Sequence, residues 1–212
     1  MYYSKQHKQR SQLETVYKYS LITGILILIV AYPLALILPV SISFENGFLE
    51  NLQVLILIVG SLYNLKLIAD SIDKEIGAFH LWSAVFMIFM AFRELSWGRV
   101  FFPIDMEDNG PVFVAMKNFS LRIEVHIMIA LFILFLILFM LKYLPLIRIF
   151  NCHLPFLIIL AMIISIIFSY VGDHGMLIGK LQGQIVEEIG ELAFYILILP
   201  LCIHYHKELS RY

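Results

Sequence analysis

The sequence has few charged residues and almost no cysteine. Asp, Glu, Lys and Arg make up 15% of the 212 residues, against about 25% in an average soluble domain. No block of Lys and Arg occurs that could cover a phosphate backbone, so we expect no nucleic-acid partner. The two cysteines, Cys152 and Cys202, form no CxxC motif, so we expect no disulfide framework.

The short motifs that identify common enzyme classes are also missing. There is no HExxH and no ExxH pattern, which excludes the zincin and di-iron bundle signatures. There is no GxSxG, no P-loop and no GxGxxG either. Any function must therefore be argued from residues that the fold brings together.

What the sequence does contain indicates a membrane protein. Hydrophobic residues make up 61% of the chain, and its mean hydropathy is +0.87. They lie in long blocks, and a block of about 20 apolar residues can cross a bilayer as a helix. We predict an all-α, polytopic membrane helix bundle with six spans, at about 20–40, 48–69, 76–97, 121–144, 156–171 and 184–203.

The first apolar block is not a cleaved leader. It exceeds the roughly 7–15 apolar residues of a signal-peptide core, and no A-x-A pattern follows it. Residues 1–19 are then a basic cytoplasmic tail, 20–204 form a single membrane domain, and 205–212 are a short cytoplasmic tail.

The basic residues predict the orientation. Six spans place both termini on one side, and most lysines and arginines fall on that side. The opposite ends of the spans hold only Arg93, Arg99, Lys117, Arg122 and Lys180. Because cytoplasmic segments carry the excess of Lys and Arg, we predict cytoplasmic termini and a multi-pass protein of the cell (plasma or inner) membrane.

The sixth span carries three carboxylates, which is the least expected feature of the chain. Glu187, Glu188 and Glu191 share one helical face with Gln184 and Tyr195, because residues three and four apart are neighbours on a helix. Ionisable groups inside a span are costly and usually face a bundle interior or a water-filled cavity. We therefore expect this stripe to face other helices.

Ionisable groups of the second to sixth spans fall at a similar depth, which predicts one acidic pocket that opens to the outer, non-cytoplasmic side. The predicted catalytic residues are Glu94, Glu188, Glu191 and His126. The predicted substrate-binding residues are Arg93, Trp97, Arg122 and Gln53, since arginine binds anionic headgroups bidentately. The predicted metal ligands are Glu50, Glu187 and Asp173, since carboxylates with some imidazole suit a divalent metal ion.

Three functions fit such a pocket. The leading hypothesis is a metal- or acid/base-dependent enzyme that acts on a membrane-associated substrate, a lipid or lipid-linked molecule in the bilayer. The first alternative is a small transporter or proton-linked carrier. Against it, the inner halves of the spans are apolar except for Asn64, Lys66 and His80. The second is a non-catalytic assembly or accessory protein whose arginine–carboxylate pairs are structural.

The longest connection, 98–120, follows the charged sequence RELSWGR at 93–99. It alternates apolar pieces with an acidic turn. We expect it either to lie on the bilayer surface or to fold back over the bundle.

Overall fold

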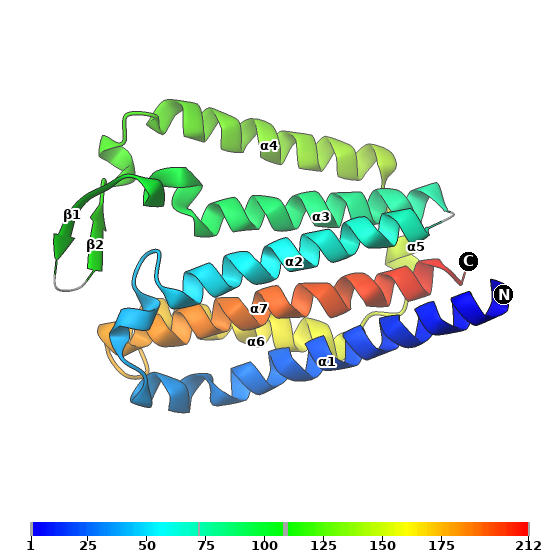
Figure 1. The fold of residues 1–212 in the computed structure, drawn as a ribbon, viewed down its shortest axis with the longest axis horizontal. Helices are drawn as coiled ribbons and strands as arrows, with labels where there is room; N and C mark the ends of the chain where they lie inside the picture. Colours follow the sequence, from blue (N-terminus) through cyan, green and yellow to red (C-terminus); the bar gives the residue numbers. More distant parts are fainter. Residues whose placement is uncertain (1, 72, 108–109, 212) are drawn as a thin grey trace. The chain divides into compact units, whose positions relative to one another are not determined.

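The computed structural model describes residues 2–71, 73–107 and 110–211, and the fold is all-α, with 82% of the chain in helices. The helices in Figure 1 are α1 (Tyr2–Ile37), α2 (Phe48–Asp70), α3 (Lys74–Glu94), α4 (Arg122–Tyr143), α5 (Leu146–Asn151), α6 (Phe156–Asp173) and α7 (Lys180–Leu209). The shorter elements are the 3-10 helices η1 (Val40–Ser43), η2 (Ser96–Phe101) and η3 (Met116–Asn118) and the strands β1 (Pro103–Glu107) and β2 (Gly110–Phe113).

Five helices in the described part of the chain are long and apolar enough to cross a membrane. They are the segment Ser11–Ile37 of α1, and α2, α3, α4 and α6. This confirms a helical membrane protein. The helix α7 is not among the five, so the sixth span stays a prediction, as does the orientation of the termini.

Most helix boundaries agree with the sequence analysis, and the exceptions are informative. The helices α2, α4 and α6 begin and end close to the predicted span limits. In contrast, α1 already begins at Tyr2, within the predicted tail, and α7 extends beyond 184–203 at both ends. The sequence analysis did not anticipate α5 or the β-hairpin. The prediction that the third span reaches Trp97 is wrong, because α3 ends at Glu94.

The chain divides into two compact units. The terminal unit comprises Met1–Val40 and Cys152–Tyr212, and the central unit comprises Ser41–Asn151. The sequence analysis expected one domain at 20–204. We describe each unit by itself.

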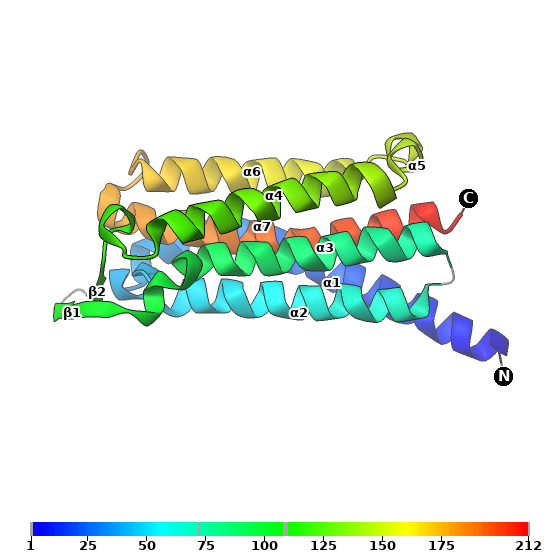
Figure 2. The same ribbon diagram turned by 90° about the horizontal axis from the view of Figure 1, so that it is seen from above.

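In the terminal unit, α7 packs along both α1 and α6 and runs antiparallel to them (Figures 1 and 2). Their shared core is built on Leu28, Ala161, Ala193 and Leu197. Small residues let the backbones of membrane helices approach closely. Gly172 shows this best, since a Cβ added there would lie 2.5 Å from the backbone nitrogen of Glu187. Glycine is therefore required where α6 crosses α7.

In the central unit, α2 and α3 form an antiparallel helical hairpin (Figure 2). The helix α3 begins at Lys74 because the Asp73 side chain caps it, accepting a hydrogen bond from the Glu75 backbone at 2.8 Å. Between the helices, His80 and Asn64 are both fully buried, with 2.8 Å between His80 Nδ1 and Asn64 Oδ1. The amide of Asn64 donates to the Gly60 carbonyl, so its oxygen is an acceptor and His80 Nδ1 carries the proton.

The helix α4 packs only lightly against α3, through aromatic side chains. The indole of Trp82 donates to the Leu136 carbonyl at 3.0 Å, and Phe89 stacks on Phe132 with 5.0 Å between ring centroids. Most large apolar side chains of α4 remain exposed. Exposed apolar side chains of this kind suit a bilayer and not water.

An ion-pair cluster outside the spans lies at the end of the central unit where α2 ends and α3 begins. Arg148 of α5 contacts Asp73 at 3.1 Å and Glu75 at 2.5 Å. The Glu75 backbone N–H and then Arg148 lower the pKa of Asp73, and the hydrogen bonds to Glu75 and Asp73 raise the pKa of Arg148. The cluster fixes α5 to the turn between α2 and α3.

Candidate functional site

The predicted site residues fall into both units. Those in the central unit are Glu50, Gln53, Arg93, Glu94, Trp97, Arg122 and His126. Those in the terminal unit are Asp173, Glu187, Glu188 and Glu191. That both sets line one pocket stays a prediction.

The end of α3 places a buried carboxylate beside an arginine. Arg93 Nη1 donates to Glu94 Oε1 at 2.9 Å, and the two side chains are 47% and 6% exposed. A carboxylate at a helix C-terminus is unfavourable because that end of the helix is partially negative. The positive charge of Arg93 offsets the negative carboxylate of Glu94 and the partial negative charge of the helix end. Part of the Arg93 side chain still faces outward. The sequence analysis predicted this pair as substrate-binding and catalytic residues.

Directly after Glu94 the backbone takes an unusual turn. Ser96, Trp97 and Gly98 have φ values of 45°, 58° and 88°. A left-handed conformation costs a residue with a Cβ about 1–2 kcal/mol, and such residues persist only where surrounding contacts hold them. The turn ends α3 and reverses the chain. This explains why the span predicted from the sequence extends beyond Glu94, where the helix ends.

The contacts that hold this turn come from two other loops. The Ser96 hydroxyl donates to Glu45 Oε1 at 3.0 Å, and Arg99 Nη2 pairs with the same oxygen. Arg99 Nη1 donates to the Val114 carbonyl at 3.0 Å. We call Glu45, Ser96 and Arg99 the turn cluster. It ties the loop before α2, the turn after α3 and the end of β2 together.

The remaining predicted residues near α2 and α3 are Trp97, Gln53 and Glu50. The ring of Trp97 packs edge-on against Phe89, with 5.0 Å between centroids, and joins the aromatic contacts between α3 and α4. Gln53 is fully buried in α2. Glu50 accepts a hydrogen bond from the Asn46 backbone at 2.5 Å, at the left-handed residue that precedes α2.

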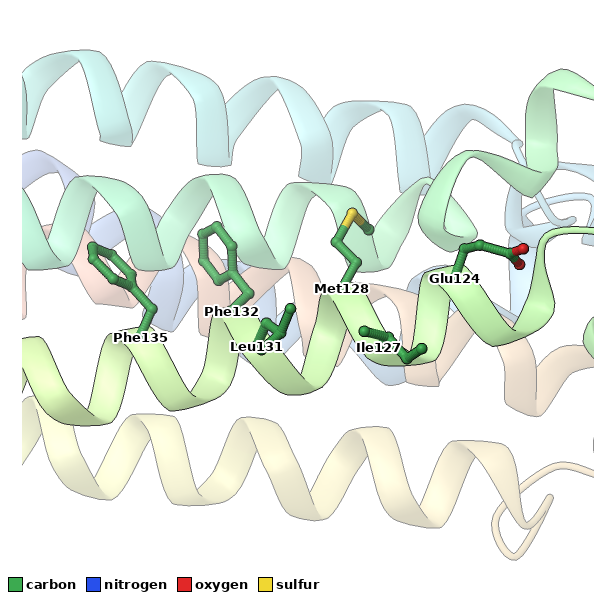
Figure 3. A pocket seen from close by; sticks show the side chains of 6 residues that line it. All are labelled: Glu124, Ile127, Met128, Leu131, Phe132 and Phe135. Atoms are coloured by element: carbon green, nitrogen blue, oxygen red, sulfur yellow. The ribbon is translucent and has the colours of Figure 1, made fainter.

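The start of α4 carries exposed polar side chains above an apolar groove. His126 Nδ1 lies 2.6 Å from the Arg122 carbonyl, to which it donates a hydrogen bond. A groove of about 520 Å³ runs along α4 (Figure 3). Its lining residues are Glu124, Ile127, Met128, Leu131, Phe132 and Phe135. Only Glu124 is charged, so the groove suits an apolar chain more than a polar solute.

In the terminal unit the three glutamates of α7 lie beside α6. Glu187, Glu188 and Glu191 are half-buried, and the Ser169 hydroxyl of α6 donates to Glu191 Oε1 at 3.4 Å. The backbones approach closely here, since a Cβ on Gly190 would lie 2.9 Å from the Ser169 nitrogen. Glu191 of the predicted stripe therefore faces α6, whereas Gln184 at the start of the stripe is exposed.

Asp173, near the end of α6, is at the surface. Its side chain is 64% exposed and lies 3.5 Å from His174 Nδ1. Across residues 2–71, 73–107 and 110–211, no three His, Cys, Asp or Glu side chains are grouped so that they could hold a metal ion. The prediction of a metal centre at Glu50, Glu187 and Asp173 thus has no support from the side-chain positions.

The sequence analysis missed the residues that shape the turn. It considered Arg99 as one of the outer arginines that could pair with carboxylates or bind a headgroup, and it gave no role to Glu45 or Ser96. The sequence RELSWGR was a usable signal, because it ends an apolar block with two arginines and a glycine. Glu45 had no such signal, since it is 54 residues from Arg99 in the chain.

Comparison of the chain with protein-family models, curated proteins and solved structures found no significant match. The function is therefore argued from the chemistry of the site.

Proposed function

We propose that this integral membrane protein binds, and acts by acid/base chemistry on, a membrane-associated substrate with an anionic headgroup. The observation that carries the proposal is the Arg93–Glu94 pair at the end of α3, held by the left-handed turn and the turn cluster. Arg93 would bind the headgroup, because guanidinium groups bind phosphate and carboxylate bidentately. Glu94 would be the general base or acid.

Two further features support a lipid-type substrate. The helices α3 and α4 are antiparallel, so the end of α3 and the start of α4 lie at the same end of the central unit (Figure 1). The groove along α4 begins there, at Glu124. An acyl chain in this groove would leave its headgroup near the membrane surface, where Arg93 and Arg122 are exposed.

The proposal keeps His126, Glu188 and Glu191 as further acid/base groups and Gln53 and Trp97 as substrate contacts. It includes no metal, because the described side chains offer no ligand set. The orientation, with this end outside the cell membrane, belongs to the proposal as well.

Native mass spectrometry of the purified protein tests the binding step. In mixed phosphatidylglycerol and phosphatidylcholine, the wild type should retain the anionic lipid preferentially. Arg93→Gln should weaken that retention by about ten- to a hundredfold, since a charge-assisted hydrogen bond contributes about 1.5–3 kcal/mol. The control is Arg211→Gln, which removes an arginine paired with Glu208 in the terminal unit. Equal retention by all three proteins would refute headgroup binding by Arg93.

A non-catalytic assembly protein is the second candidate, and one observation favours it. Arg99 pairs with Glu45, and the two side chains are 18% and 34% exposed, as in structural ion pairs. In this alternative both Arg93→Gln and Arg99→Gln would lower thermal stability and leave lipid retention unchanged. The enzyme proposal instead expects Arg99→Gln to lower stability and Arg93→Gln to lower retention.

A further inference from the structure

Three large apolar side chains close together in the connection between α3 and α4 are exposed. Phe101, Phe102 and Ile104 are 66%, 58% and 64% exposed. We call these three residues the apolar patch. They are consecutive except for Pro103, and they stand where η2 passes into β1.

The patch belongs to an ordered segment with an interior of its own. Val100 and Phe113 on either side are buried, at 4% and 9% exposure, and Arg99 ties the segment to Glu45 and to Val114. The pairing of β1 with β2 is irregular between Pro103 and Asp105, so Ile104 lies at a bulge. Bulges redirect a side chain from the regular strand pattern. The exposure of the patch therefore follows from the local fold.

The neighbouring spans determine what can cover the patch. The helices α3 and α4 are both long and apolar enough to cross a membrane, and the segment between them must lie at the membrane surface where α3 ends and α4 begins. The hairpin extends beyond the end of α3 in both views (Figures 1 and 2). Aromatic side chains are favoured at the membrane–water interface. The exposed Arg122 at the start of α4 suits anionic headgroups.

We propose that Phe101, Phe102 and Ile104 insert into the interfacial layer of the membrane leaflet from which α3 emerges. The hairpin is then a lipid-inserted anchor, which holds the turn cluster at the level of the lipid headgroups. This inference rests on the membrane placement of α3 and α4 in the proposed function, and it is independent of acid/base chemistry at Glu94.

Spin-label accessibility in nanodiscs measures the depth of each side chain. Nitroxides are attached at Phe101→Cys, Ile104→Cys and Lys117→Cys, in a protein with Cys152→Ala and Cys202→Ala. Both native cysteines are buried. We expect labels at 101 and 104 to collide severalfold more with oxygen and severalfold less with an aqueous nickel complex than the label at 117. Should the cysteine-free background fail to fold, Phe101→Trp in the native background with brominated lipids gives the same information. The tryptophan at 101 should then add fluorescence that these lipids quench.

Two outcomes would overturn the inference. Nickel accessibility at 101 and 104 equal to that at 117 would mean that the patch faces water. Low accessibility to both reagents would mean that protein covers it, either a partner or a second copy. Either result leaves the proposed function standing, because lipid retention by Arg93 is measured separately. Conversely, loss of that retention does not alter the depth of the labels.

Discussion

Replacing Gly172 with alanine should force α6 away from α7. The new Cβ would lie 2.5 Å from the Glu187 nitrogen, 2.6 Å from the Gly183 oxygen and 3.0 Å from the Glu187 Cα. All three are backbone atoms, so no side-chain rotation relieves the contact. An ordinary contact of 3.4–4 Å is restored only if the helices separate, and the separation loses packing along the whole crossing.

The magnitude follows from two opposing effects. Overpacking in a tight core costs about 1–3 kcal/mol, and the upper end applies because the obstacle is backbone. Alanine in place of glycine favours a helix by about 1 kcal/mol. The free energy of unfolding should therefore fall by about 2 kcal/mol, measured by circular dichroism during unfolding in mixed detergent micelles.

Gly77→Ala is the matched control, because Gly77 is also helical but its added Cβ would meet only an Ile68 methyl at 3.9 Å. The free energy of unfolding of this variant should be unchanged or should rise by up to about 1 kcal/mol. If Gly172→Ala is as stable as Gly77→Ala, the close crossing of α6 and α7 is wrong, and with it the placement of the α7 glutamates beside α6.

Three further perturbations test other parts of the structure. Gly98→Ala should cost about 1–2 kcal/mol through its φ of 88° alone, seen as faster hydrogen exchange after α3; unchanged exchange would contradict the left-handed turn. Asn64→Leu should lower the free energy of unfolding by about 1–3 kcal/mol, because it leaves the buried His80 N–H without that acceptor; a neutral result would contradict the pair. Asp73→Asn keeps a capping side chain but removes the charge beside Arg148. Because the pKa of Asp73 is lowered in the folded protein, the ionised carboxylate stabilises the fold fully at pH values above 3.8, the ordinary pKa of Asp. This stabilisation is lost as the pH falls through the lowered pKa of the folded protein. The variant should be less stable near neutral pH by under about 1 kcal/mol, and the difference should vanish at strongly acid pH in unfolding curves; a difference that grows with acidity would contradict the sign.

Much of the fold was predictable because the length of an apolar block is close to the length of the membrane helix that it forms. The blocks that became α2, α4 and α6 are bounded by polar or proline-containing stretches, and their limits were nearly correct. The end of α3 was not predictable in this way. Ser96 and Trp97 are compatible with a helix by their residue types, and their left-handed conformation depends on Glu45 and Val114, which lie far away in the chain.

The candidate site was also predictable only in part. Arg93 and Glu94 were identified because charged residues at the end of an apolar block are conspicuous. Helical periodicity predicted that Glu187, Glu188 and Glu191 share one face, and the contact of Ser169 with Glu191 agrees with this for Glu191. The predicted metal site has no support from the described side chains, because spacing along a helix does not determine whether carboxylates from different helices converge.

Lipid photo-crosslinking tests the central claim, a headgroup-binding site at the end of α3, most directly. An anionic phospholipid with a photoreactive group near its headgroup is incorporated into nanodiscs with the wild type and with Arg93→Gln. Peptide mass spectrometry then locates the adducts. We expect adducts concentrated on residues 93–99 and on the first turn of α4, and severalfold fewer in the variant. Adducts spread over all lipid-facing helices, and equal in the two proteins, would contradict the proposal.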